Sequence, residues 1–86
     1  MVRTGNVIKH KKFMDVAFHV GKVRGPYGPN GRVEITGAWI NQGYVKSWIL
    51  CITQKLILTD AQIKAEWQVC LEPDADCFRH VQWKDL

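Results

Sequence analysis

The side chains that could do chemistry in this chain are mostly cations near its N-terminus. Residues 1–33 contain seven Lys and Arg against a single acid, whereas residues 34–86 contain five against seven, so the two parts carry +6 and −2. Lys and Arg on one face of a sheet can neutralise phosphates and release counterions, which gives salt-dependent binding to nucleic acid. The one-sided charge therefore predicts that an anionic partner meets the N-terminal part first.

Aromatic rings that are exposed beside cations can also stack on nucleic-acid bases. We therefore predict a nucleic-acid-binding face formed by six cations and two aromatic residues: Lys9, Lys11, Lys12, Lys22, Arg24, Arg32, Tyr27 and Tyr44. Under the alternative interpretation, the basic residues only solvate an exposed face and keep a sheet edge from aggregating. Basic patches carry no sequence code by themselves, so the predicted partner is DNA or RNA of any sequence.

Cysteine and histidine form one set that resembles metal ligands. Cys77 and His80 are three residues apart, Cys70 precedes them, and Cys51 would complete four ligands. Structural zinc sites normally have two close ligand pairs, and the second pair is missing here. Because free cysteine often behaves as a small buried apolar residue, we predict no metal and no other cofactor. A bridge between Cys70 and Cys77 would suit the geometry, but a reducing cytoplasm disfavours it.

The motifs typical of enzymes are absent from the sequence. It has no nucleophile elbow and no recognised Cys–His signature, and the Gly-rich stretch 25–31 lacks the Lys and Ser/Thr of a phosphate loop. Asp74 and Asp76 lie beside Pro73, where Asp favours turns. We expect a small non-enzymatic binding module. The alternative is a protein-interaction or homo-oligomeric accessory domain, for example of a bacterium or phage, that docks through exposed apolar surface.

Length and hydropathy set the broad class. A chain of 86 residues is long enough for one domain, and we expect residues 1–86 to form a single small barrel-like unit. The longest apolar run, 48–52, is far shorter than the roughly 20 residues of a membrane-spanning helix. Lys residues interrupt the N-terminal segment, which does not read as a signal peptide. These features, with three cysteines suited to reduced thiols, predict a cytoplasmic protein without membrane contact.

Alternating hydrophobicity predicts strands in the first half. Apolar side chains recur at every second residue along 16–20 and 33–39, and 44–53 is rich in β-branched and aromatic residues. Val7-Ile8 begins an earlier strand. The turn segment that ends in Asn30-Gly31 and a second turn at 41–43 make these strands antiparallel neighbours.

The second half mixes helix and strand signals. Thr59 and Gln62 fit a capping box, which predicts a short helix over about 60–68 with Ile63 and Trp67 on one face. In the competing interpretation 66–71 is a strand. A turn at 72–76 follows in either case, and 77–83 would be a closing strand with Phe78 and His80 on one face. The expected fold is mainly β: a small antiparallel curled sheet, or an SH3-like or OB-like barrel, of four to six strands with at most one short helix.

The position of Trp48 depends on the loop that precedes it. A two-residue loop at 42–43 would pair Gly37 with Trp48 and place Trp48, Leu50 and Ile52 in the core beside Trp39. A three-residue turn at 41–43 would pair Trp39 with Val45 and turn Trp48 to the opposite face. A slip of one residue exchanges the two faces of a strand, so only one register can hold. We favour the two-residue loop, because it groups the large apolar side chains.

Overall fold

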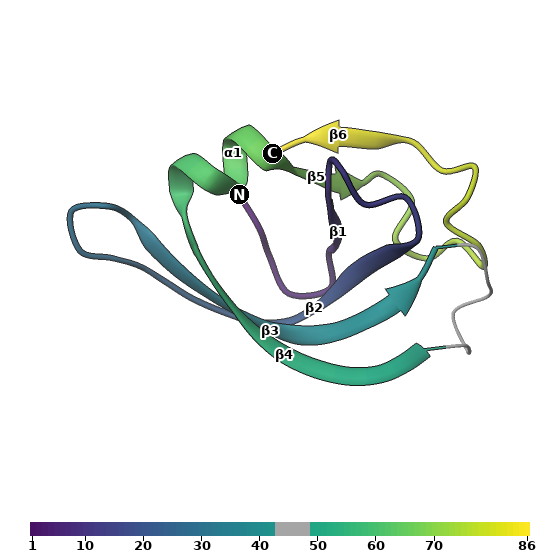
Figure 1. Ribbon diagram of the computed structural model, residues 1–86, viewed down its shortest axis with the longest axis horizontal. Helices are drawn as coiled ribbons and strands as arrows, with labels where there is room; N and C mark the ends of the chain where they lie inside the picture. Colours follow the sequence, from purple (N-terminus) through teal and green to yellow (C-terminus); the bar gives the residue numbers. More distant parts are fainter. Residues whose placement is uncertain (43–48) are drawn as a thin grey trace.

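The fold is an open, curled antiparallel sheet with one short helix (Figure 1). The computed structural model describes residues 1–42 and 49–86, and of 49–51 the backbone alone. In these ranges the elements are β1 (Val7–His10), β2 (Val16–Tyr27), β3 (Arg32–Asn41), β4 (Ile49–Thr59), α1 (Asp60–Glu66), β5 (Trp67–Cys70) and β6 (Trp83–Asp85). The strands are ordered β4-β3-β2-β1-β5-β6. The predicted mainly β curled sheet is confirmed, and the sheet does not close into a barrel.

The long strands β2 and β3 form a hairpin arm that projects beyond the helix (Figure 1). Their pairing runs from Val16 opposite Asn41 to Tyr27 opposite Arg32, so the predicted hairpin is confirmed with 28–31 as its loop. Gly28 and Gly31 adopt φ angles of 69° and 63° there. This left-handed region costs glycine little, and the loop can therefore turn tightly.

Two apolar clusters hold the sheet, one on each face. The larger cluster includes Ile8, Phe18 and Ile35 and is covered by Ile63 of α1 and Trp67 of β5. The smaller cluster packs Val7, Ala17, Ile40, Cys70 and Phe78 together on the other face. Val7 and Ile8 are adjacent in β1 and enter different clusters, because successive side chains of a strand point to opposite faces. Strand β1 is therefore buried on both sides.

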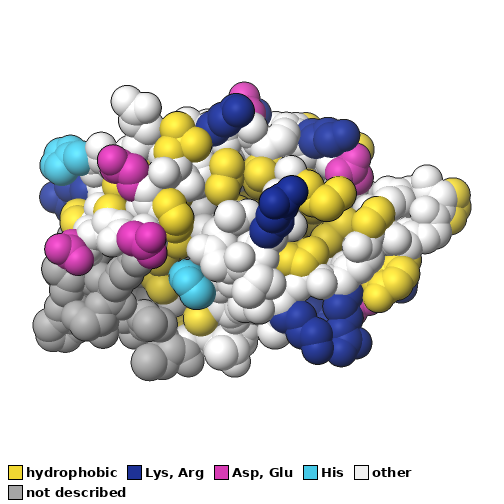
Figure 2. Space-filling model, turned by 180° about the vertical axis from the view of Figure 1, so that it is seen from behind, with side chains coloured by type: hydrophobic (Ala, Val, Ile, Leu, Met, Phe, Trp, Pro, Cys, Tyr) yellow, Lys and Arg dark blue, Asp and Glu magenta, His cyan; other side chains and the backbone are white. Residues whose placement is uncertain are grey.

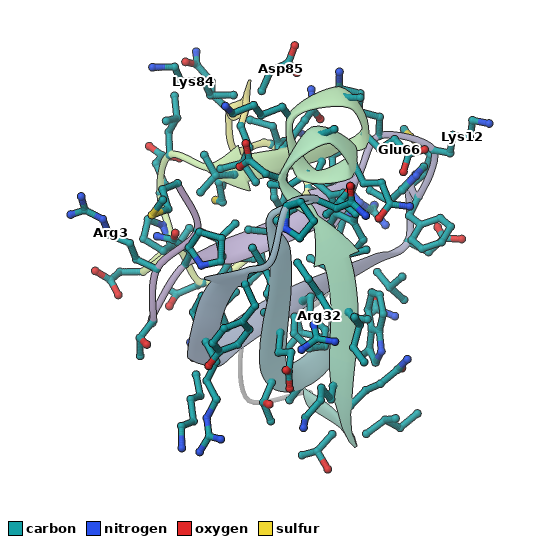
Figure 3. The ribbon with its side chains drawn as sticks, turned by 90° about the vertical axis from the view of Figure 1, so that its left-hand side faces the viewer. Arg3, Lys12, Arg32, Glu66, Lys84 and Asp85 are labelled. Carbon is teal, nitrogen blue, oxygen red and sulfur yellow. The ribbon has the colours of Figure 1, made fainter. Side chains whose placement is uncertain are left out.

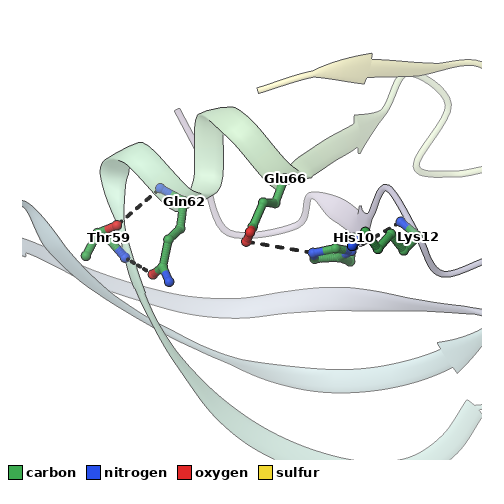
Figure 4. A network of polar contacts seen from close by, with 5 residues as sticks. All are labelled: His10, Lys12, Thr59, Gln62 and Glu66. Atoms are coloured by element: carbon green, nitrogen blue, oxygen red, sulfur yellow. Dashed lines mark hydrogen bonds and ion pairs between the residues drawn. The ribbon is translucent and has the colours of Figure 1, made fainter.

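The predicted capping box at the start of α1 is confirmed (Figure 4). Thr59 Oγ1 accepts a hydrogen bond of 3.1 Å from the backbone of Gln62, whose Oε1 accepts one of 2.9 Å from the backbone of Thr59. The helix ends at Glu66 rather than 68, and Trp67 begins β5. Each of the two competing interpretations of 60–71 was therefore correct for part of the segment, with the strand following the helix. Ile63 and Trp67 are both buried, but only Ile63 belongs to the helix.

Strand β4 corrects the predicted register. Gly37 pairs with Gln54 and Trp39 with Ile52, so both predicted loops are wrong. The chain between β3 and β4 is longer than either loop, because Ile40 pairs with Ile49. Ile52 is 56% exposed rather than in the core, since β4 forms an edge of the sheet. The predicted strand 44–53 is instead β4, Ile49–Thr59, and Trp48 lies outside the described residues.

The segment 71–82 also differs from its prediction. The turn at 72–76 is confirmed by a hydrogen bond of 3.0 Å from the Ala75 amide to the Glu72 carbonyl. The closing strand is limited to β6, and Phe78 is buried whereas His80 is exposed. The reason is that the Phe78 amide donates to the Gln42 carbonyl, at 3.1 Å, instead of joining a strand ladder. Phe78 thereby closes the smaller cluster.

Gly37 on β3 lies close against His19 and Phe18 of β2. A Cβ atom at this position would overlap the His19 carbonyl oxygen and lie 2.7 Å from Cε2 of Phe18. Gly37→Ala should therefore lower the free energy of unfolding by about 3 kcal/mol, the upper part of the usual range for overpacking. Urea denaturation would measure the loss, with the exposed Thr36→Ala as a control within about 0.5 kcal/mol of the parent protein. A Gly37→Ala variant of parental stability would show that the strands are spaced differently.

Candidate nucleic-acid interface

Four cations project from one face of three adjacent strands, and we call this surface the basic strand face. It consists of Lys22 and Arg24 on β2, Arg32 on β3 and Lys55 on β4. Cross-strand pairing fixes their arrangement: Lys22 lies opposite Thr36, which lies opposite Lys55. Neighbouring strands are about 4.8 Å apart, so the backbones of Lys22 and Lys55 are separated by roughly 10 Å. The intervening Val23 points to the apolar cluster on the other side.

One carboxylate partly balances the basic strand face. Glu34 lies opposite Arg24 in the sheet and forms ion pairs of 3.8 Å with Arg32 and 3.2 Å with Lys55. In the part of the chain that the structure describes, Lys22 and Arg24 form no ion pair. The four cations and Glu34 sum to +3, and two of the cations have no ion-pair partner among the residues that the structure describes. Figure 2 shows Lys and Arg side chains gathered beneath the hairpin arm.

An aromatic ring borders the same face. Tyr27 lies opposite Arg32 and is 45% exposed. The Arg32 guanidinium carbon lies 5.7 Å from the centroid of the Tyr27 ring, a distance typical of a cation–π contact. This contact holds one side of the ring against the sheet and leaves nearly half of the residue accessible. The arrangement suits stacking on an unpaired base.

The remaining predicted cations lie elsewhere. Lys9 is 8% exposed, with its ammonium group 5.4 Å from the centroid of the Trp83 ring. Lys11 forms an ion pair of 3.6 Å with Asp85. Lys12 and Arg32 point to different sides of the molecule (Figure 3). Tyr44 lies outside the described residues. Four of the eight predicted residues therefore share one surface: Lys22, Arg24, Arg32 and Tyr27.

Asp85 explains why Lys11 is engaged. The side-chain amide of Gln68 donates a hydrogen bond of 3.0 Å to Oδ1 of Asp85, and the Lys11 ammonium group lies near Oδ2. Both interactions favour the carboxylate and hold the pKa of Asp85 below its ordinary value, the hydrogen bond having the larger effect. Lys11 therefore already has an anionic partner within this protein.

Lys55 belongs to the basic strand face and was missed by the sequence analysis. Lys55 lies in the part of the chain whose net charge is negative, so the search for clustered positive charge did not include it. Its place follows from the pairing of β4 with β3, in which it stands opposite Thr36. The correct register of β4 against β3 would have placed Lys55 on this face.

His10 belongs to a small polar network beside the helix (Figure 4). Its Nδ1 accepts a hydrogen bond of 3.1 Å from the Lys12 backbone, and its Nε2 lies 3.7 Å from Oε2 of Glu66. The Lys11 amide donates to the Glu66 carbonyl at 2.8 Å. These contacts fasten the end of β1 to the end of α1, which is a structural role.

The thiols and possible metal ligands are dispersed. Cys70 is buried in the smaller apolar cluster, and Cys77 is partly buried. Across residues 1–42 and 52–86, no three His, Cys, Asp or Glu side chains gather as metal ligands would. The absence of zinc remains a prediction, which elemental analysis would test.

In the part of the chain that the structure describes, no helix is long and apolar enough to cross a membrane.

Comparison with known proteins identifies no relative of this chain. No family model, no curated protein and no solved structure matches the chain.

Proposed function

We propose that this protein is a non-enzymatic module that binds nucleic acid through its basic strand face. The observation that carries the proposal is the alignment of Lys22, Arg24, Arg32 and Lys55 on one surface of β2, β3 and β4. Each strand of a DNA duplex carries one phosphate charge about every 3.4 Å along the helix axis, and cations with spacings of about 7–10 Å can contact such a row of charges. The contacts go to the backbone, so we expect weak sequence preference.

The exposed ring of Tyr27 predicts that the protein binds single strands more tightly than duplexes. A base that stacks on the accessible part of the ring gains about 1–3 kcal/mol, whereas bases in a duplex are already stacked. Tyr27→Ala should therefore weaken binding to single strands by at least about 5-fold and leave duplex binding nearly unchanged. Tyr27→Phe keeps the ring and should bind like the parent protein. Equal losses on single and double strands would contradict a stacking role.

Fluorescence anisotropy with labelled DNA and RNA, single- and double-stranded, tests the proposed function. At about 50 mM salt the protein should bind all of them, and affinity should fall steeply as salt is raised. Each phosphate contact contributes roughly 0.7–0.9 to the slope of log K against log salt, so three to four contacts predict a slope of about −2 to −4. If none of the four nucleic acids binds at low salt, the proposed function is wrong.

The second candidate is self-association through β4, and it rests on a different observation. β4 is an edge strand of 11 residues, and Ile52 and Ile57 on it are 56% and 60% exposed. Long exposed edge strands with apolar side chains tend to pair with another strand. Light scattering after gel filtration would show a dimer that Ile57→Lys converts to monomer. A monomer across the accessible concentration range would exclude this candidate.

A further inference from the structure

A second site lies apart from the basic strand face. A cavity of about 560 Å³ opens between the β1–β2 loop, the end of β3 and the segment that leads into β6. Its walls include two cations, Lys9 and Arg79, one carboxylate, Asp15, and the indole of Trp83. Cavities of about 300–1,000 Å³ are typical of small-molecule sites.

Lys9 is the unusual member of this cavity. Its residue is 8% exposed, yet it forms no ion pair with any carboxylate that the structure describes. Within that same part of the chain, the Trp83 ring at 5.4 Å is the partner of its ammonium group. The Lys9 ammonium nitrogen is not among the buried polar atoms that lack a partner in the described residues, so it stays accessible from the cavity while the methylene chain is buried. The ammonium group is therefore available to an anion that enters the cavity.

The walls of the cavity are held in place by Gln42, which is itself 7% exposed. Its side-chain amide donates to the Val16 carbonyl at 2.6 Å and to the Phe13 carbonyl at 3.3 Å. Its backbone amide donates to the Asp15 carbonyl at 2.9 Å, and its carbonyl accepts from Phe78 at 3.1 Å. These bonds fix three chain segments around Lys9 before any ligand arrives, which lowers the entropic cost of binding.

We propose that this cavity binds a small anion, a carboxylate or a phosphate group, on the ammonium group of Lys9. Arg79 supplies a second cation from the outer wall, and Trp83 covers the Lys9 side chain. With Asp15 included, the three charged groups sum to +1, so the cavity attracts anions. Because Lys9 is recessed in the wall of the cavity, the site favours a compact ligand over the backbone of a nucleic-acid polymer.

Amide and indole NMR spectra during titration with sodium phosphate or sodium acetate, at constant ionic strength, test this proposal. One or both anions should shift the Trp83 indole signal and the Lys9 and Arg79 amides along a saturable curve. A response to acetate alone assigns the site to carboxylates, and one to phosphate alone assigns it to phosphate groups. If neither anion produces a saturable shift at these residues, the proposal is wrong.

Variants separate a binding site from a lysine that is merely buried. Lys9→Met keeps the length of the side chain and should abolish the saturable shift. Arg79→Gln, at an exposed position that tolerates change, should weaken binding by about 5-fold, and it serves as the test if Lys9→Met does not fold. Arg3→Gln is the matched control and should bind as tightly as the parent protein. An unchanged response in Lys9→Met, or in Arg79→Gln where that variant is the test, would overturn the proposal.

This site and the proposed nucleic-acid interface can fail independently. Lys22→Glu and Arg24→Glu change the basic strand face and should leave the anion response of the Trp83 indole intact. Lys9→Met should leave the affinity for nucleic acid intact. If the Lys22 and Arg24 variant also loses the indole response, the anion binds the basic strand face and the cavity is not its site.

Discussion

Phe78→Ala should lower the free energy of unfolding by about 3–5 kcal/mol, the usual cost of removing a buried Phe side chain. Phe78 is 1% exposed and packs against Val7, Ala17, Ile40 and Cys70 on one face of the sheet. In a small domain whose total stability is on the order of 5 kcal/mol, the loss would leave a large fraction of molecules unfolded at room temperature. Within segment 71–82, Ala75 and Val81 also pack against this cluster but are only partly buried, so Phe78 supplies the largest apolar contact.

Urea denaturation followed by tryptophan fluorescence would measure this effect. Phe78→Leu keeps most of the apolar volume and should lose much less stability than Phe78→Ala. Leu71→Ala is the matched control, because Leu71 lies in the same segment and is 52% exposed. It should change the free energy of unfolding by less than about 0.5 kcal/mol. A Phe78→Ala variant as stable as Leu71→Ala would mean that segment 71–82 does not cover the sheet.

Reversing two charges on the basic strand face should cause the largest loss of nucleic-acid binding. Lys22 and Arg24 are exposed and unpaired among the described residues, so they are free to meet phosphates. The double variant Lys22→Glu with Arg24→Glu should bind on the order of 100-fold more weakly at low salt, and its salt slope should be smaller by about 1.4–1.8. Competition titrations on single-stranded DNA would measure both quantities.

The control for this double variant must match its change in net charge. Arg3→Glu with Lys12→Glu lowers the net charge equally, and both residues lie away from the basic strand face (Figure 3). This control should lose far less affinity, since only long-range attraction is reduced. Equal losses in the two double variants would show that net charge, and not the basic strand face, determines binding.

The sequence predicted those parts of the fold that depend on local pattern. Alternation along 16–20 and 33–39 indicated β2 and β3, and Asn30-Gly31 indicated the loop between them. Thr59 and Gln62 form the expected cap because their hydrogen bonds join residues three apart. Such interactions are decided within a few residues, so a single sequence contains the information.

The parts that could not be predicted depend on contacts between distant residues. Placing β4 opposite β3 requires knowing how many residues connect the two strands. Without that length, the sequence does not show that Lys55 lies on the basic strand face. Lys9 was predicted to be exposed with its basic neighbours, but Val7 and Lys9 share the face that segment 71–82 and Trp83 cover. Nothing near Lys9 in the sequence indicates this cover, because Trp83 is 74 residues away.

The most direct test of the account is an NMR map of where nucleic acid touches the protein. Amide spectra of the labelled protein during titration with a short single-stranded DNA should shift most at Lys22, Arg24, Arg32 and Lys55, which lie on three strands but one surface. Lys11 and Lys12 should shift little, although they belong to the same basic part of the sequence. The largest shifts at Lys11 and Lys12, or none at Lys22 and Lys55, would contradict the basic strand face as the binding surface.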